Sequence, residues 1–255
     1  MPKLRNVSDL RYYLYKSTSK IEMLYEQIYE SSTHSTRKSA RGGPSFASGT
    51  IESTTQEVVS LDEKLSAVEE DLDYRKLIGS LDDPKEYCRG IMPMRWGLYD
   101  DLGERPETEP ALVYFGGFNK DGPLVLGLGG SSRHVTGHQG ASSTYSRSAT
   151  PVLVKWLLAG VQHGGPPNLP KWDSAFDMDD VYAAIAIAQH YLKPPTQNLE
   201  FVAKTLIVGR VDDYEAFIGV SSAKVILATP LWVAQSPPYL DEENHWGLDD
   251  EWETS

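Results

Sequence analysis

Two apolar runs separated by a short polar turn constrain the fold of this chain more than any other feature of its sequence. Residues 111–118 and 124–128 are rich in Val, Leu, Phe and Gly, and Asn119-Lys120-Asp121-Gly122 joins them. An Asp-Gly pair between two apolar runs is typical of a β-hairpin. We therefore expect antiparallel strands here, which argues against a doubly wound parallel sheet.

The spacing of apolar residues predicts further strands and helices on both sides of this hairpin. Additional strands are expected at residues 10–16, 87–96 and 224–235. Pro93 should place the second of these at a sheet edge or a bulge, and Pro230 should limit the pairing of the third. Helices are expected after the N-cap candidates at residues 17–19 and at residues 62–81, 150–162, 179–192 and 199–208. This order predicts an α+β fold, with a mainly antiparallel sheet of about five strands covered by helices.

Composition is that of an ordinary globular protein. Of the 255 residues, 40% are hydrophobic and 24% are charged. No apolar run approaches the roughly 20 residues that a membrane-spanning helix needs, and the N-terminus lacks the apolar segment of a signal peptide. A single cysteine, Cys88, allows neither an internal disulfide nor a cysteine-based zinc cage. We therefore expect a cytoplasmic protein with one α+β domain over residues 1–240.

Acidic residues dominate the charge, and many of them lie at the C-terminal end. The formal net charge of −12 argues against broad contact with nucleic-acid phosphates, and no membrane partner is predicted. Residues 241–255 are crowded with Asp and Glu, which is typical of a solvated tail, although Trp246 and Trp252 leave docking on a protein partner open. Residues 31–55, rich in Ser, Thr and Gly, are expected to form an exposed, mobile loop.

The strongest candidate for a binding site lies at the end of the hairpin. An apolar strand runs there into a cluster of small and polar residues, Gly129, Gly130, Ser131, Ser132, Arg133 and His134. It is neither a Walker loop nor a dinucleotide fingerprint, because no Gly-Lys-Ser/Thr follows and no β-α-β unit surrounds it. Glycines let backbone N–H groups approach an anion, and the polar side chains add donors. The alternative is a strand that leaves the sheet through a glycine bulge before a polar surface loop.

Arg95 and Trp96 are predicted neighbours of this cluster. A guanidinium can bind an anion while an adjacent indole stacks on a ring. We therefore expect Arg95, Trp96 and residues 129–134 to line one pocket for an anionic ligand. The alternative places Trp96 in the core and pairs Arg95 with Asp100 or Asp101.

His134 is the best catalytic candidate, because an imidazole that titrates near neutral pH can move protons. His138 lies four residues further on, the spacing of two metal ligands on a helix. No helix is predicted there and no Glu completes the set, so no metal site is expected. The sequence indicates no cofactor.

Several short motifs follow one another in a defined order. They are Arg11-Tyr12-Tyr13-Leu14-Tyr15, Met94-Arg95-Trp96-Gly97, Tyr114-Phe115-Gly116-Gly117, Gly127-Leu128-Gly129-Gly130-Ser131 with His134 and Gly137, Leu199-Glu200-Phe201-Val202-Ala203-Lys204, and Thr229-Pro230-Leu231-Trp232-Val233-Ala234. In these motifs the chain resembles an uncharacterised, chiefly actinobacterial family known as a domain of unknown function. The resemblance spans residues 10–235. It implies one domain and brings no established activity, cofactor or catalytic residue.

These features predict a regulatory or sensory module that binds a small anionic ligand, with a nucleotide as one candidate. An enzyme is the first alternative, in which His134 moves a proton and Arg95 or Arg133 holds the negative charge of the substrate. A protein-interaction module that acts through the acidic tail at residues 241–255 is the second.

Overall fold

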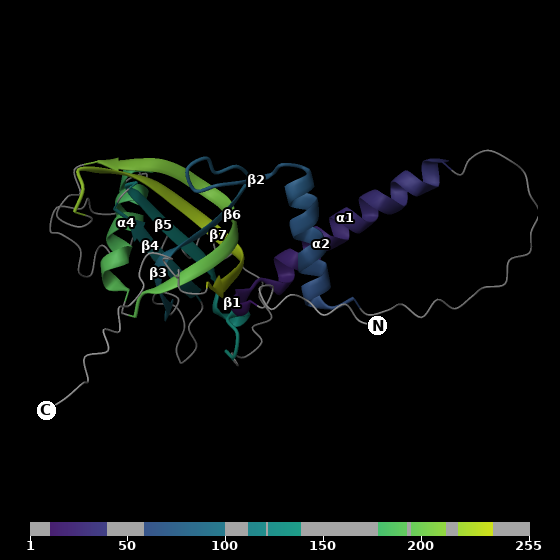
Figure 1. Cartoon of the computed structure of the whole chain (residues 1–255), viewed down its shortest axis with the longest axis horizontal. Coiled ribbons are helices and arrows are strands. Elements are labelled where there is room, and N and C mark those ends of the chain that lie inside the picture. The colour runs from purple at the N-terminus through teal and green to yellow at the C-terminus, as the bar shows by residue number, and fades with distance from the viewer. Residues whose placement is uncertain are drawn as a thin grey trace, which may run out of the picture.

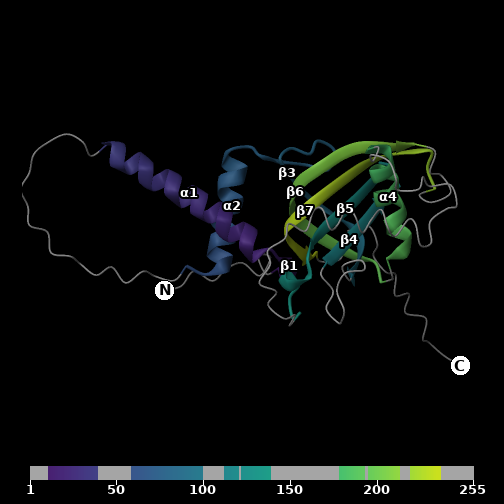
Figure 2. The same cartoon turned by 180° about the vertical axis from the view of Figure 1, so that it is seen from behind.

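The computed structural model shows a β-barrel with helices on two sides (Figures 1 and 2). It describes residues 11–39, 59–99, 112–120, 122–138, 178–192, 195–212 and 219–236. The strands are β1 (Tyr12–Lys16), β2 (Ile78–Gly79), β3 (Tyr87–Tyr99), β4 (Leu112–Asn119), β5 (Leu124–Ser131), β6 (Gln197–Asp212) and β7 (Ser222–Gln235). The helices are α1 (Thr18–Ser39), α2 (Leu61–Tyr74), α4 (Met178–Tyr191) and a short 3-10 turn, η2 (Ser132–His134).

Five of the strands close into a ring in the order β3-β4-β5-β7-β6, and β6 pairs back onto β3. Neighbours in the ring are antiparallel except β5 and β7, which run parallel. β1 adds to β7, and β2 adds to β3. The predicted hairpin is confirmed, since Phe118 pairs with Val125 across it. The expected α+β class agrees with this structure, and the expected, mainly antiparallel sheet of about five strands is a closed barrel with two short additional strands.

The segment at residues 199–208, for which a helix was expected, is part of the strand β6, so that prediction is wrong. Leu199, Phe201 and Ala203 alternate into the barrel interior, while Val202 packs on the other side against the layer of α1 and α2. Both faces of the strand are buried at this point. Phe201, Val202 and Ala203 are therefore three consecutive buried apolar residues, and the period of two that identifies a strand is hidden there.

The two prolines lie in strands at points where pairing changes. β3 pairs with β6 up to Met94 and with β4 from Met94 onwards, so Pro93 sits just before β4 begins to pair. β3 is therefore a wall strand of the barrel rather than an edge strand. In β7, Pro230 pairs with Ala203 of β6 beside a shift in register. That shift confirms the expected limit on pairing at Pro230.

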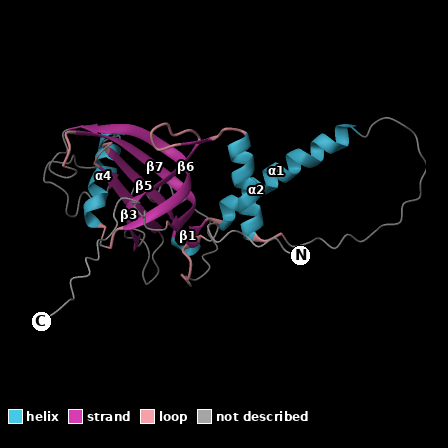
Figure 3. Cartoon of the chain, viewed as in Figure 1, coloured by secondary structure: helices cyan, strands magenta, loops and turns pink. Residues whose placement is uncertain are grey.

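The core has three apolar clusters, one inside the barrel and one under the helices on each side, and Figure 3 shows the helices on the two sides of the strands. Side chains from all five ring strands fill the barrel, among them Met94, Phe115, Leu126, Phe201 and Ile226. On one side α4 packs its alanine-rich body against β4, β5, β6 and β7, which confirms the helix expected at residues 179–192. On the other side α1 and α2 cover the fully buried Trp232 of β7. Helices therefore cover the barrel on two sides.

The first helix is longer than the sequence suggested. α1 runs to Ser39 and projects away from the barrel, so the loop expected from residue 31 begins after residue 39 at the earliest. Ser and Thr lower helix propensity by only a few tenths of a kcal/mol each, and the first glycine after the helix start is Gly42. Residues 40–58 lie outside the described part of the chain.

The helix expected at residues 62–81 ends earlier, at Tyr74. The Lys76 N–H donates to Asp73 O, and the Leu77 N–H donates to Leu72 O over 2.9 Å each. These two bonds form a Schellman motif, which closes a helix on a residue with positive φ. Lys76 takes that position with φ +59°. The chain then reverses into β2, a change that the apolar spacing alone did not reveal.

Replacing Lys76 with glycine should stabilise the protein by about 0.5–1 kcal/mol. A left-handed conformation costs a side-chain-bearing residue roughly 1 kcal/mol, and glycine adopts it freely. Urea denaturation of Lys76→Gly measures the gain. Lys64→Gly, in the middle of α2, is the matched control and should lose about 1 kcal/mol. Equal losses in both variants would refute the argument.

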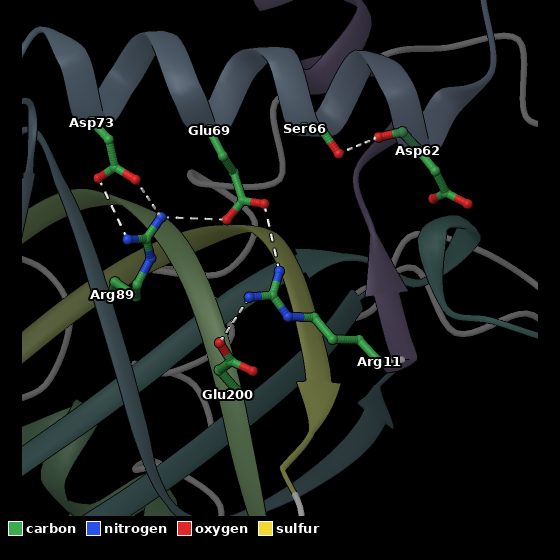
Figure 4. A network of polar contacts seen from close by, with 7 residues as sticks. All are labelled: Arg11, Asp62, Ser66, Glu69, Asp73, Arg89 and Glu200. Carbon is green, nitrogen blue, oxygen red and sulfur yellow. Dashed lines mark hydrogen bonds and ion pairs between the residues drawn. The ribbon is translucent and has the colours of Figure 1, made fainter. Parts of the chain in front are cut away.

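Ion pairs attach α2 to the barrel (Figure 4). Arg89 of β3 lies 2.9 Å from Asp73 and 3.4 Å from Glu69, while Arg11 lies 3.6 Å from Glu69 and 3.2 Å from Glu200. The Arg11 guanidinium also lies 4.6 Å from the centre of the buried Trp232 ring. On this side of the molecule both arginines therefore have carboxylate partners.

If the ring strands β3 to β7 are numbered from one to five in chain order, they follow one another around the barrel as first, second, third, fifth and fourth. In the chain, α4 lies between the third strand, β5, and the fourth, β6. This is the connectivity of the OB-fold, a five-stranded Greek-key barrel whose second and third strands bind nucleic acids or oligosaccharides. Here the outer face of those strands, β4 and β5, packs against α4 through Tyr114 and Val125. The chain's own helix occupies this region of the face that OB-folds offer to a ligand.

Candidate functional site

The glycine-rich end of the hairpin is a regular strand. β5 continues through residues 129–131 in register with β4, so the glycine bulge considered as an alternative is wrong. A Cβ atom on Gly130 would lie 2.4 Å from the Tyr15 hydroxyl, and one on Gly127 would lie 2.4 Å from the Tyr114 hydroxyl. These two glycines therefore make room for tyrosine rings.

The polar turn that follows is packed against β1 (Figures 1 and 2). Val135 forms a β-bridge with Tyr15, whose ring is almost fully buried. The Tyr15 hydroxyl hydrogen-bonds to the Ser17 side chain and the Ser131 backbone. Burial raises the pKa of Tyr15 to about 12. Residues 131–138 are thus fixed beside the start of α1.

Near the start of α1, the strand that pairs with one edge of β7 changes. On one side it pairs with β5 over residues 224–228 and with β1 over residues 232–235, which leaves residues 229–231 between the two partners. The Ser17 N–H, just before α1, donates to Leu231 O over 2.8 Å. The first turn of α1 is thereby fixed where β5 and β1 diverge.

Lys20, in this first turn, carries a partly buried ammonium group. Its Nζ donates to the Thr229 hydroxyl and, over 3.0 Å, to Pro230 O. The first turn of α1 contains no acidic residue, so a lysine there faces the positive end of the helix dipole. α2 shows the usual arrangement, with Asp62 and Glu63 in its first turn. Burial lowers the pKa of Lys20 to about 8.

Arg133 and His134 of η2 face the same region. Arg133 Nε donates to His134 Nε2 over 3.2 Å, and Ser19 Oγ lies 3.4 Å from the same nitrogen. Because a guanidinium can only donate, Nε2 carries the lone pair and the ring proton is on Nδ1. Burial, together with the positive charges of Arg133 and Lys20, lowers the pKa of His134 to about 4. The imidazole is therefore neutral at pH 7.

We refer to Lys20, Arg133 and His134 as the basic cluster. Within the part of the chain that the structure describes, none of the three lies within 4.0 Å of a carboxylate, unlike the arginines beside α2. Hydroxyl groups surround the cluster and account for the buried polar side chains of the described residues, Ser17, Ser132 and Thr229. This is where positive charge, burial and hydroxyl groups come together without a neutralising partner.

Arg95 lies elsewhere. Its Nε donates to Thr196 Oγ1 over 3.1 Å, and its Nη1 donates to Leu192 O over 3.3 Å. These contacts place it beside the C-terminal end of α4, on the face of β3 opposite to Trp96. The structure therefore does not bring Arg95 to the basic cluster. Asp100 and Asp101, its alternative partners, lie outside the described residues.

Trp96 is connected to the basic cluster through a series of aromatic contacts. It stacks on Phe115 with 5.7 Å between ring centres, Phe115 lies 6.2 Å from Tyr15, and Tyr15 lies 5.8 Å from His134. Trp96 is half-buried and packs against the barrel core. Of the sequence-predicted site, the structure thus brings Ser131, Ser132, Arg133 and His134 together, with Trp96 separated from them by two aromatic rings.

A model of a family of unknown function, DUF7019, matches residues 11–237. The chain belongs to the DUF7019 family. The match covers the whole barrel and its helices, and it confirms the expected membership of a family without an assigned activity. No curated protein and no solved structure matches this DUF7019 chain significantly.

The geometry bears on the catalytic and metal hypotheses for this DUF7019 protein. A His134 with a pKa of about 4 is a weak general base near neutral pH, and its basic nitrogen already accepts from Arg133. In the described ranges no three His, Cys, Asp or Glu side chains come together as a metal site requires. None of the described helices combines the length and apolar character needed to cross a membrane.

Sequence reasoning missed four residues of the site: Ser17, Ser19, Lys20 and Thr229. One local signal was available, because a helix start that reads Ser-Thr-Ser-Lys has a cation where acidic residues are favoured. Thr229 could not be found in this way, since only the tertiary fold brings β7 to α1. The helix expected at residues 150–162 and the tail at residues 241–255 lie outside the described part of the chain.

Proposed function

We propose that this DUF7019 protein is a regulatory or sensory module whose basic cluster binds a small anionic ligand, such as the phosphate group of a nucleotide. One observation supports this most strongly. A partly buried lysine, an arginine and a histidine converge beside the start of α1, and none of them has a carboxylate partner among the described residues.

Electrostatics favours an anion at this position. A buried cation without a counter-ion is costly, and the free N–H groups at the start of a helix add partial positive charge. An anion would offset both. Ser19 and Arg133 lie at the exposed side of the cluster, so their donors are accessible to a ligand from solvent.

The proposed site differs from the pocket expected from the sequence. It keeps residues 131–134 and adds Ser17, Ser19, Lys20 and Thr229. Arg95 is left out because its contacts lie beside α4. Nucleic acid is not the proposed ligand. The protein is strongly acidic, and α4 occupies part of the barrel face that nucleic-acid-binding OB-folds use.

Thermal denaturation in the presence of inorganic phosphate, sulfate or nucleotides tests the proposal. A ligand that binds only the folded state stabilises it by about 2.7 kcal/mol at a hundredfold excess over its Kd. We expect at least one of these anions to raise the Tm of the wild-type protein. Arg133→Gln should reduce the shift strongly, because it removes the most accessible cation of the cluster.

Arg75→Gln is the matched control, since Arg75 is a half-exposed arginine 2.9 Å from Asp71 on α2. It should leave the anion-dependent shift unchanged. A shift lost equally in both variants would indicate a general charge effect, and no shift with any anion would refute the proposal.

A further inference from the structure

We infer that the basic cluster binds a dianionic phosphate monoester in preference to a monoanionic ligand of the same shape, and that the protein takes up a proton when it does so. This inference rests on the proposed function and specifies the ligand class of the same site. It follows from the number of positive charges at the site and from the way they are held.

The site contains more positive charge than a monoanion can balance. Arg133 Nε and Ser19 Oγ lie 3.2 Å and 3.4 Å from His134 Nε2, and Lys20 follows Ser19 in the first turn of α1, so the three groups lie close together. The charges of Lys20 and Arg133 both act on His134. The start of α1 adds a partial charge of about +0.5. A monoanion leaves a net positive charge in a partly buried place, whereas a dianion brings the locus close to neutrality.

Two of the three groups can also gain a proton. Burial and cationic neighbours hold His134 neutral, and burial lowers the pKa of Lys20 to about 8, so that near pH 8 this lysine is only partly protonated. A dianion beside them favours their charged forms, so binding and protonation are coupled.

Among the residues that the structure describes, the groups packed around Lys20 do not supply an alternative counter-charge. β7 contributes the neutral Thr229 hydroxyl and a backbone carbonyl, and η2 contributes Arg133 and His134. Neighbouring charges near the start of α1 are paired with each other. Lys16 lies 2.7 Å from Asp62, and Glu22 lies 3.9 Å from Lys64.

Phenyl phosphate and phenyl sulfate form the matched pair of probes. Both carry a tetrahedral oxyanion on the same ring, but near pH 8 the phosphate ester is a dianion, since its second pKa is about 6, and the sulfate ester is a monoanion. Isothermal titration calorimetry at about pH 8 with the full chain gives both affinities. Repetition in two buffers of different ionisation enthalpy gives the number of protons taken up.

We expect phenyl phosphate to bind about tenfold or more tightly than phenyl sulfate, because one additional charge interacts with the cluster. About half a proton should be taken up with it, since Lys20 is close to half-protonated at this pH. Lys20→Met should lose this uptake and most of the preference. Lys204→Met, which changes an exposed lysine of β6 beside Glu86, should retain both.

The outcomes separate this inference from the proposed function. Equal affinity for the two esters, or a preference for phosphate without proton uptake, would overturn the inference while leaving an anion site in place. If inorganic phosphate binds and neither ester does, a monoester ligand is also refuted. If inorganic phosphate, sulfate and nucleotides do not bind either, the proposed function itself fails.

Discussion

Gly130→Ala is expected to destabilise the protein by about 2–3 kcal/mol. The added Cβ would lie 2.4 Å from the Tyr15 hydroxyl and 2.8 Å from the adjacent ring carbon. Tyr15 cannot move aside easily, because it is 1% exposed and hydrogen-bonded to Ser17 and Ser131. Overpacking of this kind strains either the β5 backbone or the contact between β1 and η2.

Urea denaturation measures the loss, and Gly122→Ala is the matched control. A Cβ at Gly122 meets no atom within 4 Å, so that variant should keep nearly wild-type stability. Tyr15→Phe in the Gly130→Ala background should recover part of the loss, because it removes the nearest clashing atom. If Gly130→Ala is as stable as Gly122→Ala, then Gly130 has no packing role and a ligand-binding role for it gains support.

Lys20→Met is expected to raise the stability of the ligand-free protein at pH 7 by about 2 kcal/mol. Lowering the pKa of Lys20 from 10.5 to about 8 corresponds to a cost of about 3 kcal/mol for the buried charge. Methionine removes that cost at similar side-chain volume. The loss of the hydrogen bonds to Thr229 and Pro230 subtracts about 1 kcal/mol.

The pH dependence identifies the cause. Below about pH 8 Lys20 is charged in both the folded and the unfolded chain, so the cost is fully present. Between about pH 8 and 10.5 the unfolded chain binds more protons, and the free energy of unfolding of the wild-type protein should rise with pH. The advantage of Lys20→Met should therefore shrink across this range.

Urea denaturation at a series of pH values measures this difference, with Lys204→Met as the exposed control. A Lys20→Met variant that is less stable than wild type at pH 7, with an unchanged pH profile, would assign Lys20 a purely structural role as a cap on the β7 carbonyl. A gain in stability together with a loss of anion binding would indicate a residue kept for function at the expense of stability.

Patterns of a few neighbouring residues correctly predicted the hairpin and the helix α4. The hairpin of β4 and β5 follows from an Asp-Gly turn between apolar runs, and α4 follows from alanine content between an acidic start and two prolines. β6 was mistaken for a helix because its two faces meet different apolar layers. Closure of the barrel also escaped prediction, since the pairing of β3 with β6 joins segments that are far apart in sequence.

The candidate site was predicted only in part, because local sequence patterns reveal some of its residues and not those that the tertiary fold brings to it. Residues 131–134 stand out as a polar run after glycines, and the structure places them beside the first turn of α1. Arg95 is a cation that could bind an anion, but its side chain lies on the face of β3 opposite to Trp96, beside α4. Lys20 was overlooked because its importance depends on burial against β7, which no local pattern encodes.

By itself the sequence determined which segments form the hairpin, the first and last strands and the helix α4, and which turn carries an arginine and a histidine together. These follow from side-chain periodicity and turn chemistry, which act over a few residues. Only the tertiary structure decided that the sheet closes, that two of the glycines make room for tyrosines, and that Lys20 joins Arg133 and His134. Those outcomes depend on burial and on contacts between distant segments, and it is this burial that lowers the pKa values of Lys20 and His134.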